Sequence, residues 1–185
     1  MSGQAGSGKS TLAKSISTRM RFTHYSSGDY VRERAVQAGY PSVTDFLDHC
    51  RSTGYPIDKE TDDWVVAKGS ERFIVIDSRL AFHFIRNSFK VLLTLDPRVA
   101  AERSFRDANR LRRESERNKT LEEAVADIKR RQANDVEAYW KLYGIDDYMD
   151  SRHYNLVIDT GSPTYDGRPE AVLDRVLAAY REWWS

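Results

Sequence analysis

A glycine-rich stretch near the start of the chain carries the residues best suited to hold phosphate. The run "GQAGSGKS", Gly3 to Ser10, matches the pattern G-x-x-x-x-G-K-[S/T], and helical spacing follows it directly. Glycines let successive backbone N–H groups turn inward as an anion nest, which the N-terminal end of a following helix reinforces. Lys9 adds a charge for the β- and γ-phosphates of a nucleotide, and the Ser10 hydroxyl is a ligand for Mg²⁺. The residues predicted to hold the nucleotide are Gly3, Gly6, Ser7, Gly8, Lys9, Ser10 and Thr11.

A second group of polar residues follows two of the predicted strands. Ser27, Asp29 and Arg32 come shortly after the run "RFTHY", while Asp77 ends the run "RFIVID" and Arg79 follows it. Parallel strands end at a common crevice, and an arginine can clamp a phosphate with two parallel hydrogen bonds. We therefore predict that Arg32 and Arg79 bind the phosphate of an acceptor, with Ser27 and Asp29 beside it, and that Asp77 orients Mg²⁺ through water.

A series of arginines occupies the middle of the chain. Arg103, Arg106, Arg110, Arg113 and Arg117 recur every three or four residues, so one helix would align them on one face. Such a face could stabilise negative charge during phosphoryl transfer and exclude water. The alternative for the last three arginines is a solvated, charged helix.

Short apolar runs alternate with helical patterns along the whole chain. The predicted strands are residues 21–25, 72–77, 89–95 and 154–159, and the predicted helices are residues 9–20, 29–38, 58–68, 97–108, 120–143 and 169–183. Pro97 suits a first helical position, and Thr120 with Glu123 forms a capping-box pattern. This alternation predicts one α/β domain, residues 1–185, with a mostly parallel sheet covered by helices on both faces.

Only Met1 and Ser2 precede the glycine-rich loop, although a buried strand normally leads into it. Losing about five buried apolar residues would forfeit roughly ten kcal/mol of folding free energy. We therefore expect the first strand to be missing or truncated within this numbering and to be completed by further residues.

Composition restricts the partners of the chain. Its 185 residues include 29 lysines and arginines against 28 aspartates and glutamates, so bulk charge favours neither nucleic acid nor a membrane. The single cysteine, Cys50, excludes an intrachain disulfide, and no apolar run reaches transmembrane length. We expect a soluble cytoplasmic protein, monomeric or weakly dimeric, that binds small nucleotide substrates, no nucleic acid and no membrane.

Several motifs together resemble the nucleoside monophosphate kinases, and most closely the short archaeal-type cytidylate kinases. The matching stretches, in the family's order, include "GQAGSGKST", "SSGDYVRERA", "IDKETD", "VIDSRLA", "TLEEAVADIKRRQ", "YGID" and "YNLVIDT". The resemblance implies a three-layer P-loop NTPase fold, ATP and Mg²⁺ as cofactors, and phosphoryl transfer to a nucleoside monophosphate, with CMP or dCMP the first expectation.

The same resemblance implies two further parts and several site residues. A helical segment at about residues 40–64 would close over the monophosphate, with Asp58 near its base or ribose, and an arginine-rich lid would cover about residues 103–120. Arg103, Arg110 and Arg113 would belong to the lid. Lys9, Arg106 and Arg131 would contact the transferred phosphoryl group.

A few residues depart from the family's pattern, and they cluster on the acceptor side. Ser78 replaces a glycine beside Arg79, Leu80 stands where bacterial cytidylate kinases carry an aspartate, and Ala138 replaces an arginine. The acceptor therefore remains open. The alternatives are a P-loop kinase for another small molecule, or a nucleotide-binding regulatory protein without turnover.

Overall fold

The computed structural model describes residues 1–4, 6–103, 120–162 and 168–185, excepting the side chain of residue 131. The strands are β1 (Ser2–Gly3), β2 (Thr23–Ser26), β3 (Ile74–Asp77), β4 (Val91–Thr94) and β5 (Leu156–Asp159). The helices are α1 (Lys9–Met20), α2 (Ser27–Gln37), α3 (Val43–Thr53), α4 (Ile57–Gly69), α5 (Ala81–Phe84), α7 (Leu121–Tyr143) and α8 (Pro169–Trp184), with a short 3₁₀ turn at Ser151–His153. Residues 97–103 are also helical.

The described strands form a parallel sheet whose centre contains the shortest strand. Ladders pair β2 with β3, β1 with β4, and β4 with β5, all in parallel. Met1 joins the two ladders, because its nitrogen donates to the Ile76 oxygen at 2.7 Å and its own oxygen accepts from Ser78 N at 3.1 Å. The ladders themselves form a three-stranded sheet, β1-β4-β5, and a two-stranded sheet, β2-β3. The bonds of Met1 place the two-residue β1 beside β3 as well as beside β4.

Each predicted strand is confirmed, but each begins two residues later than predicted. Two of the shortened starts have a local cause: Arg21 and Phe73 both have φ +57°, in the left-handed region that a strand excludes. Arg21 also caps the C-terminus of α1, with its N–H donated to Ser17 O. The chain therefore becomes extended only after these two residues.

Side chains cap the starts of α2, α3 and α7. Ser26 and Ser42 accept from backbone N–H groups in the first turns of α2 and α3, and Thr120 with Glu123 makes the predicted capping box of α7. Pro169 occupies the first turn of α8, where its missing N–H costs nothing. Helices α1, α2, α4, α7 and α8 lie within two residues of their predicted bounds, whereas α3 and α5 were not among the predicted helix ranges.

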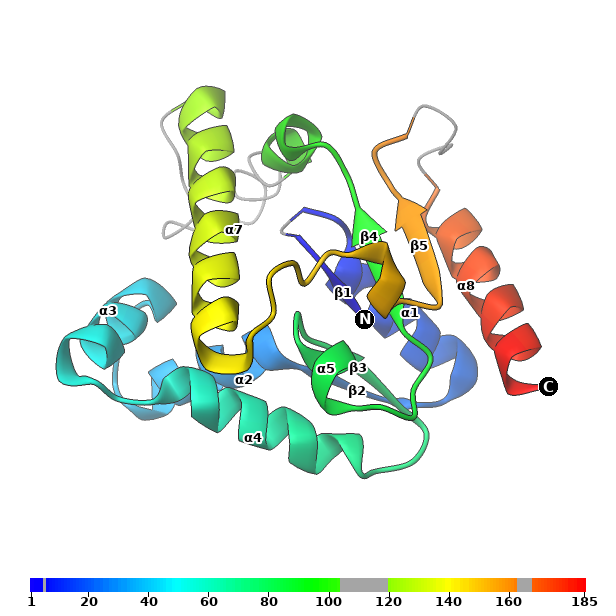
Figure 1. The fold of residues 1–185 in the computed structure, drawn as a ribbon, viewed down its shortest axis with the longest axis horizontal. Helices are drawn as coiled ribbons and strands as arrows, with labels where there is room; N and C mark the ends of the chain where they lie inside the picture. Colours follow the sequence, from blue (N-terminus) through cyan, green and yellow to red (C-terminus); the bar gives the residue numbers. More distant parts are fainter. Residues whose placement is uncertain (5, 104–119, 163–167) are drawn as a thin grey trace.

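Helices cover both faces of the sheet, as the alternation predicted. On one face, α1 and α8 pack against Val75, Leu93 and Ile158. On the other face, α4 and α5 pack around Ile76, and α7 packs beside Leu80. Figure 1 shows α7 on the same side of the molecule as α2 to α4, with α8 at the opposite side, where the chain ends.

The helical segment at residues 40–64 consists of α3 and the first part of α4, and it is tied to α2 by Glu60. The carboxylate of Glu60 accepts from Tyr30 Oη at 2.7 Å and from Tyr55 Oη at 2.5 Å. Its Oε1 also lies 2.6 Å from Arg34 Nε. Hydrogen bonds from the two tyrosines, Tyr55 first, lower the pKa of Glu60. Within the described ranges, no helix is long and apolar enough to cross a bilayer.

Candidate active site

The glycine-rich loop joins β1 to α1. Its first glycine is packed against β4, and its last glycine, at the start of α1, faces open space. Gly3 has φ +140°, and a β-carbon there would lie 2.2 Å from the carbonyl oxygen of Leu93 on β4. Gly8 has φ +85°, caps α1, and would direct a β-carbon into open space. The first turn of α1 contains no acidic residue, and its N–H groups have no partner inside the helix. The open end of the loop therefore suits an anion.

The other predicted loop residues lie around this opening. Gly6 lies against the backbone of Ala100, and Ser7 is buried at 1% exposure. Lys9 Nζ reaches back across the loop and donates to Gln4 O at 3.2 Å. Burial lowers the pKa of the Lys9 ammonium group, and the carboxylate of Asp77 opposes that effect. Thr11 is exposed in the first turn of α1.

Ser10 and Asp77 meet at this site although 67 residues separate them. Ser10 Oγ donates to Asp77 Oδ2 at 2.6 Å, and Asp77 is 5% exposed at the end of β3. Ser27 Oγ donates to the main-chain oxygen of Asp77 at 3.3 Å. Hydroxyl and carboxylate oxygens are ligands that Mg²⁺ accepts while it keeps waters and binds phosphates. The pair therefore fits a Mg²⁺ ion that is bound together with a nucleotide.

Arg79 lies two residues beyond Asp77 and reaches α7. Its Nη1 donates to Asp135 Oδ1 at 3.3 Å, and its Nε lies 3.3 Å from Asp135 Oδ2. Its main-chain oxygen accepts from Ser2 Oγ at 2.9 Å, which ties this turn to β1. Charge-assisted hydrogen bonds between nitrogen and carboxylate are usually about 2.7–2.9 Å long. Both contacts between Arg79 and Asp135 are longer than this.

Two other predicted acceptor residues lie at more exposed positions. Arg32 pairs with Asp29 on its own helix, and the two side chains are 55% and 57% exposed. Asp58 is exposed in the first turn of α4. Their predicted roles in binding an acceptor stay predictions. Arg106, Arg110 and Arg113 lie outside the described residues.

Leu80 and Ser78 show how the acceptor side differs from the expected pattern. Leu80 is 2% exposed and packs in a cluster with Ile145 and Tyr148. A side chain buried there belongs to the core and is not available to contact a base. Ser78 is 6% exposed, and its backbone N–H is used in the pairing with Met1. The leucine at position 80 therefore serves packing, whereas the pairing of Ser78 uses its main chain and would be the same with glycine.

Two residues that the sequence analysis did not select join the site through tertiary contacts. Asp135 of α7 holds Arg79, and Thr160, directly after β5, binds Arg103 through two oxygens. The sequence position of Thr160 could have indicated a site residue, because polar residues at the carboxyl end of a parallel strand border the ligand-binding crevice. Asp135 carried no distinguishing pattern on a long charged helix.

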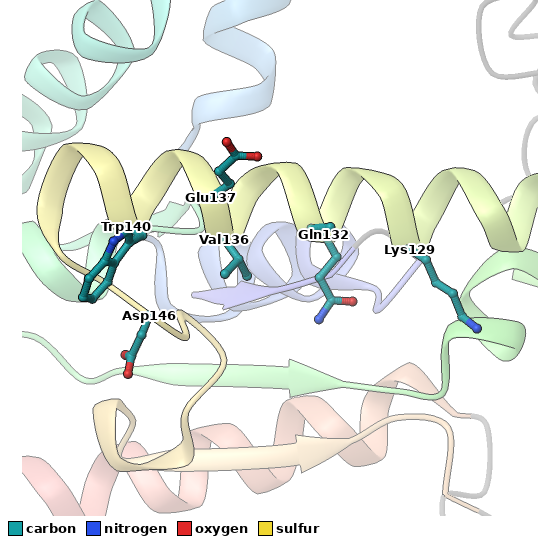
Figure 2. Close-up of a pocket in the computed structure, with 7 residues that line it drawn as sticks. Lys129, Gln132, Val136, Glu137, Trp140 and Asp146 are labelled. Atoms are coloured by element: carbon teal, nitrogen blue, oxygen red, sulfur yellow. The ribbon is translucent and has the colours of Figure 1, made fainter.

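A hollow of about 770 Å³ runs along α7, away from the glycine-rich loop. Figure 2 shows Lys129, Gln132 and Val136 on successive turns of α7, with Trp140 and Asp146 at one end. Trp140 is 59% exposed. Among the described residues that line it, the hollow has one cation, Lys129, and the carboxylates of Glu137 and Asp146. This charge balance does not suit a polyphosphate, so the phosphate-binding geometry remains that of the glycine-rich loop.

The glycine nest, Lys9 and the Ser10–Asp77 pair at the end of a parallel sheet define a P-loop nucleotide-binding domain. Residues 2–122 match the family described as an AAA domain. A cytidylate kinase of Pyrococcus furiosus is 34% identical over 90% of this chain and 81% of its own length. The chain belongs to the P-loop kinase family of the archaeal cytidylate kinases.

Two further comparisons place the chain among other proteins. An S-adenosylmethionine-dependent nucleotide dehydratase of Lacinutrix mariniflava is 31% identical over 98% of this chain, which spans only 35% of that protein. A shikimate kinase from Bacteroides thetaiotaomicron has a similar fold, with a TM-score of 0.64, 17% identity and coverage of 97% of this chain and 96% of that one. The last likeness concerns the fold alone.

Proposed function

We propose that this protein transfers the γ-phosphoryl group of Mg²⁺-ATP to a nucleoside monophosphate, with CMP or dCMP as the first acceptor to test. The observation that carries the proposal is the Ser10–Asp77 pair at the open end of a glycine nest, beside Lys9. The relatives named cytidylate kinase support the choice of acceptor.

The proposed reaction needs no nucleophilic side chain. An oxygen of the acceptor phosphate attacks the γ-phosphorus, the bond from that phosphorus to the bridging β–γ oxygen breaks, and ADP and a nucleoside diphosphate leave. Mg²⁺, when bound, neutralises charge on the β- and γ-phosphates, and Ser10 with Asp77 would hold it. Lys9 adds charge at the same phosphates, and the loop N–H groups fix their position.

On the acceptor side, Arg79 is the proposed phosphate ligand that lies nearest in the chain to Asp77. It follows β3 at the same edge as Asp77, and its side chain is 37% exposed. Asp135 keeps the guanidinium in place until a phosphate replaces it. Arg32, Ser27, Asp29 and Asp58 complete the proposed acceptor side. Arg103, Arg106 and Arg131 are proposed to stabilise the transferring group.

The test is coupled ADP release from Mg²⁺-ATP with CMP, dCMP, UMP, AMP, GMP and dTMP supplied separately. We expect rapid turnover with one or two of these acceptors and none with the Lys9→Met variant, whose melting temperature should stay near that of the wild type. No release with any acceptor, while ATP still raises the melting temperature, would refute the kinase and favour another acceptor or a regulatory role.

A second candidate follows from the dehydratase relative, in which nearly the whole of this chain matches about a third of the length. We infer that a kinase of this kind can supply phosphorylated nucleotide to a reaction that removes water from it. Mass spectrometry of nucleotides from cells that express this protein should then show a nucleotide lighter by one water. Its absence, with phosphorylation intact, would leave the kinase activity alone.

A further inference from the structure

Thr160 joins three parts of the site by hydrogen bonds. It directly follows β5, is 3% exposed, and extends the ladder because its N–H donates to Thr94 O at 2.8 Å. Its hydroxyl lies 3.3 Å from Ser7 O in the glycine-rich loop and 3.3 Å from Thr94 O. Ser7 and Thr160 are 153 residues apart in the sequence.

The same residue holds Arg103. Arg103 Nη2 donates to Thr160 O at 2.7 Å, and Nη1 donates to Thr160 Oγ1 at 3.3 Å. Arg103 is the last described residue of the helical stretch 97–103 and the first residue of the predicted lid. The guanidinium is therefore linked to the phosphate-binding loop through one buried threonine.

The chemistry of a hydroxyl allows Thr160 to serve both neighbours at once. A hydroxyl has one proton to donate and two lone pairs that can accept. The hydroxyl proton can go to Ser7 O or to Thr94 O, which both lie 3.3 Å away. A lone pair on Thr160 Oγ1 accepts the hydrogen bond from Arg103 Nη1. A valine has the same shape and can do neither.

We propose that Thr160 is a positioning residue that holds Arg103 beside the glycine-rich loop, where the guanidinium binds the polyphosphate of a nucleotide. The proposal rests on the proposed function, because it assigns Arg103 to the nucleotide. Thr160 itself does not contact the nucleotide. Its hydrogen bonds orient both the Arg103 guanidinium and the main-chain carbonyl of Ser7.

The experiment is calorimetric titration of the protein with Mg²⁺-ADP, with no acceptor present. Thr160→Val keeps the 2.7 Å bond from Arg103 to the main-chain oxygen but loses the contacts of the hydroxyl. It should therefore raise the Kd for ADP by roughly five- to tenfold, the effect of losing one ordinary hydrogen bond. Thr160→Ser keeps the hydroxyl and should bind within about twofold of the wild type. Thr18→Val is the matched control, because the Thr18 hydroxyl is exposed and bonds only to Lys14 O of its own helix among the described residues.

A double variant separates positioning from a structural role. If Thr160 acts through Arg103, Thr160→Val should add less than about a twofold change to the Kd of Arg103→Ala. Two results would overturn this inference and leave the proposed function standing. One is a double variant whose increase in Kd corresponds to the sum of the two single effects on binding free energy. The other is an unchanged Kd for Thr160→Val while the wild type binds ADP. A wild type that binds no ADP would overturn the inference together with the proposed function, and a lowered melting temperature with an unchanged Kd would assign Thr160 to stability only.

Discussion

Two glycines of the phosphate-binding loop should respond very differently to the same substitution. At Gly3 an added β-carbon would meet Leu93 O at 2.2 Å, while at Gly8 it would meet nothing within 4 Å. Both residues have positive φ, which disfavours alanine. Gly3→Ala therefore combines backbone strain with a collision against the neighbouring strand, whereas Gly8→Ala has the strain alone.

The magnitudes follow from these two environments. For Gly8→Ala we expect a loss of about 1–2 kcal/mol in unfolding free energy, or about 2–8 °C in melting temperature for a chain of this size. For Gly3→Ala the backbone strain is about 1–3 kcal/mol. Moving β1 away from β4 adds about 2 kcal/mol or more, so we expect a fall of about 6–20 °C.

Thermal denaturation followed by circular dichroism, with ADP titration of each folded variant, measures both effects. Gly8→Ala should remain folded at 20 °C but lose ADP binding, because its methyl group projects at the open end of the nest. A Gly3→Ala protein that melts within about 3 °C of the wild type would refute the close approach of β1 to β4. ADP binding by Gly8→Ala equal to the wild type would count against the nest as the phosphate site.

Three further predictions concern the surroundings of the site. Glu60→Gln should lower the unfolding free energy by about 1–3 kcal/mol, because three donors lose a charged acceptor, while Lys59→Gln, which breaks an exposed pair, should stay within about 0.5 kcal/mol in urea denaturation. Burial raises the pKa of Asp62 to about 6 from 3.8. The neutral carboxyl is therefore favoured in the fold, and stability present below pH 4 is lost as pH rises through 6. Asp62→Asn should melt a few degrees above the wild type at pH 7.5 and not at pH 4.5, and an equal difference at both pH values would contradict this assignment. Arg79→Ala should raise the acceptor KM at least about tenfold and leave the ATP KM unchanged, with the exposed Arg152→Ala as control, and an unchanged acceptor KM would remove Arg79 from the acceptor site.

Much of the fold was predictable from local patterns. The helix predicted at residues 9–20 is α1 with the same bounds, and the capping box at Thr120 and Glu123 forms as predicted. Capping acts within one helical turn, so a short stretch of sequence contains all the atoms involved. Strand starts were less well predicted, because Arg21 and Phe73 adopt left-handed backbone conformations that their residue types do not announce.

The sequence by itself determined the phosphate-binding loop, the alternation of strands and helices, and the placing of Asp77 and Arg79 at a strand end. The tertiary structure decided the partners: Ser10 with Asp77, Arg79 with Asp135, and Arg103 with Thr160. It also decided that Leu80 belongs to the core. The physical reason is that these contacts join residues tens of positions apart. They exist only because the parallel register of the sheet brings the strand ends to one edge.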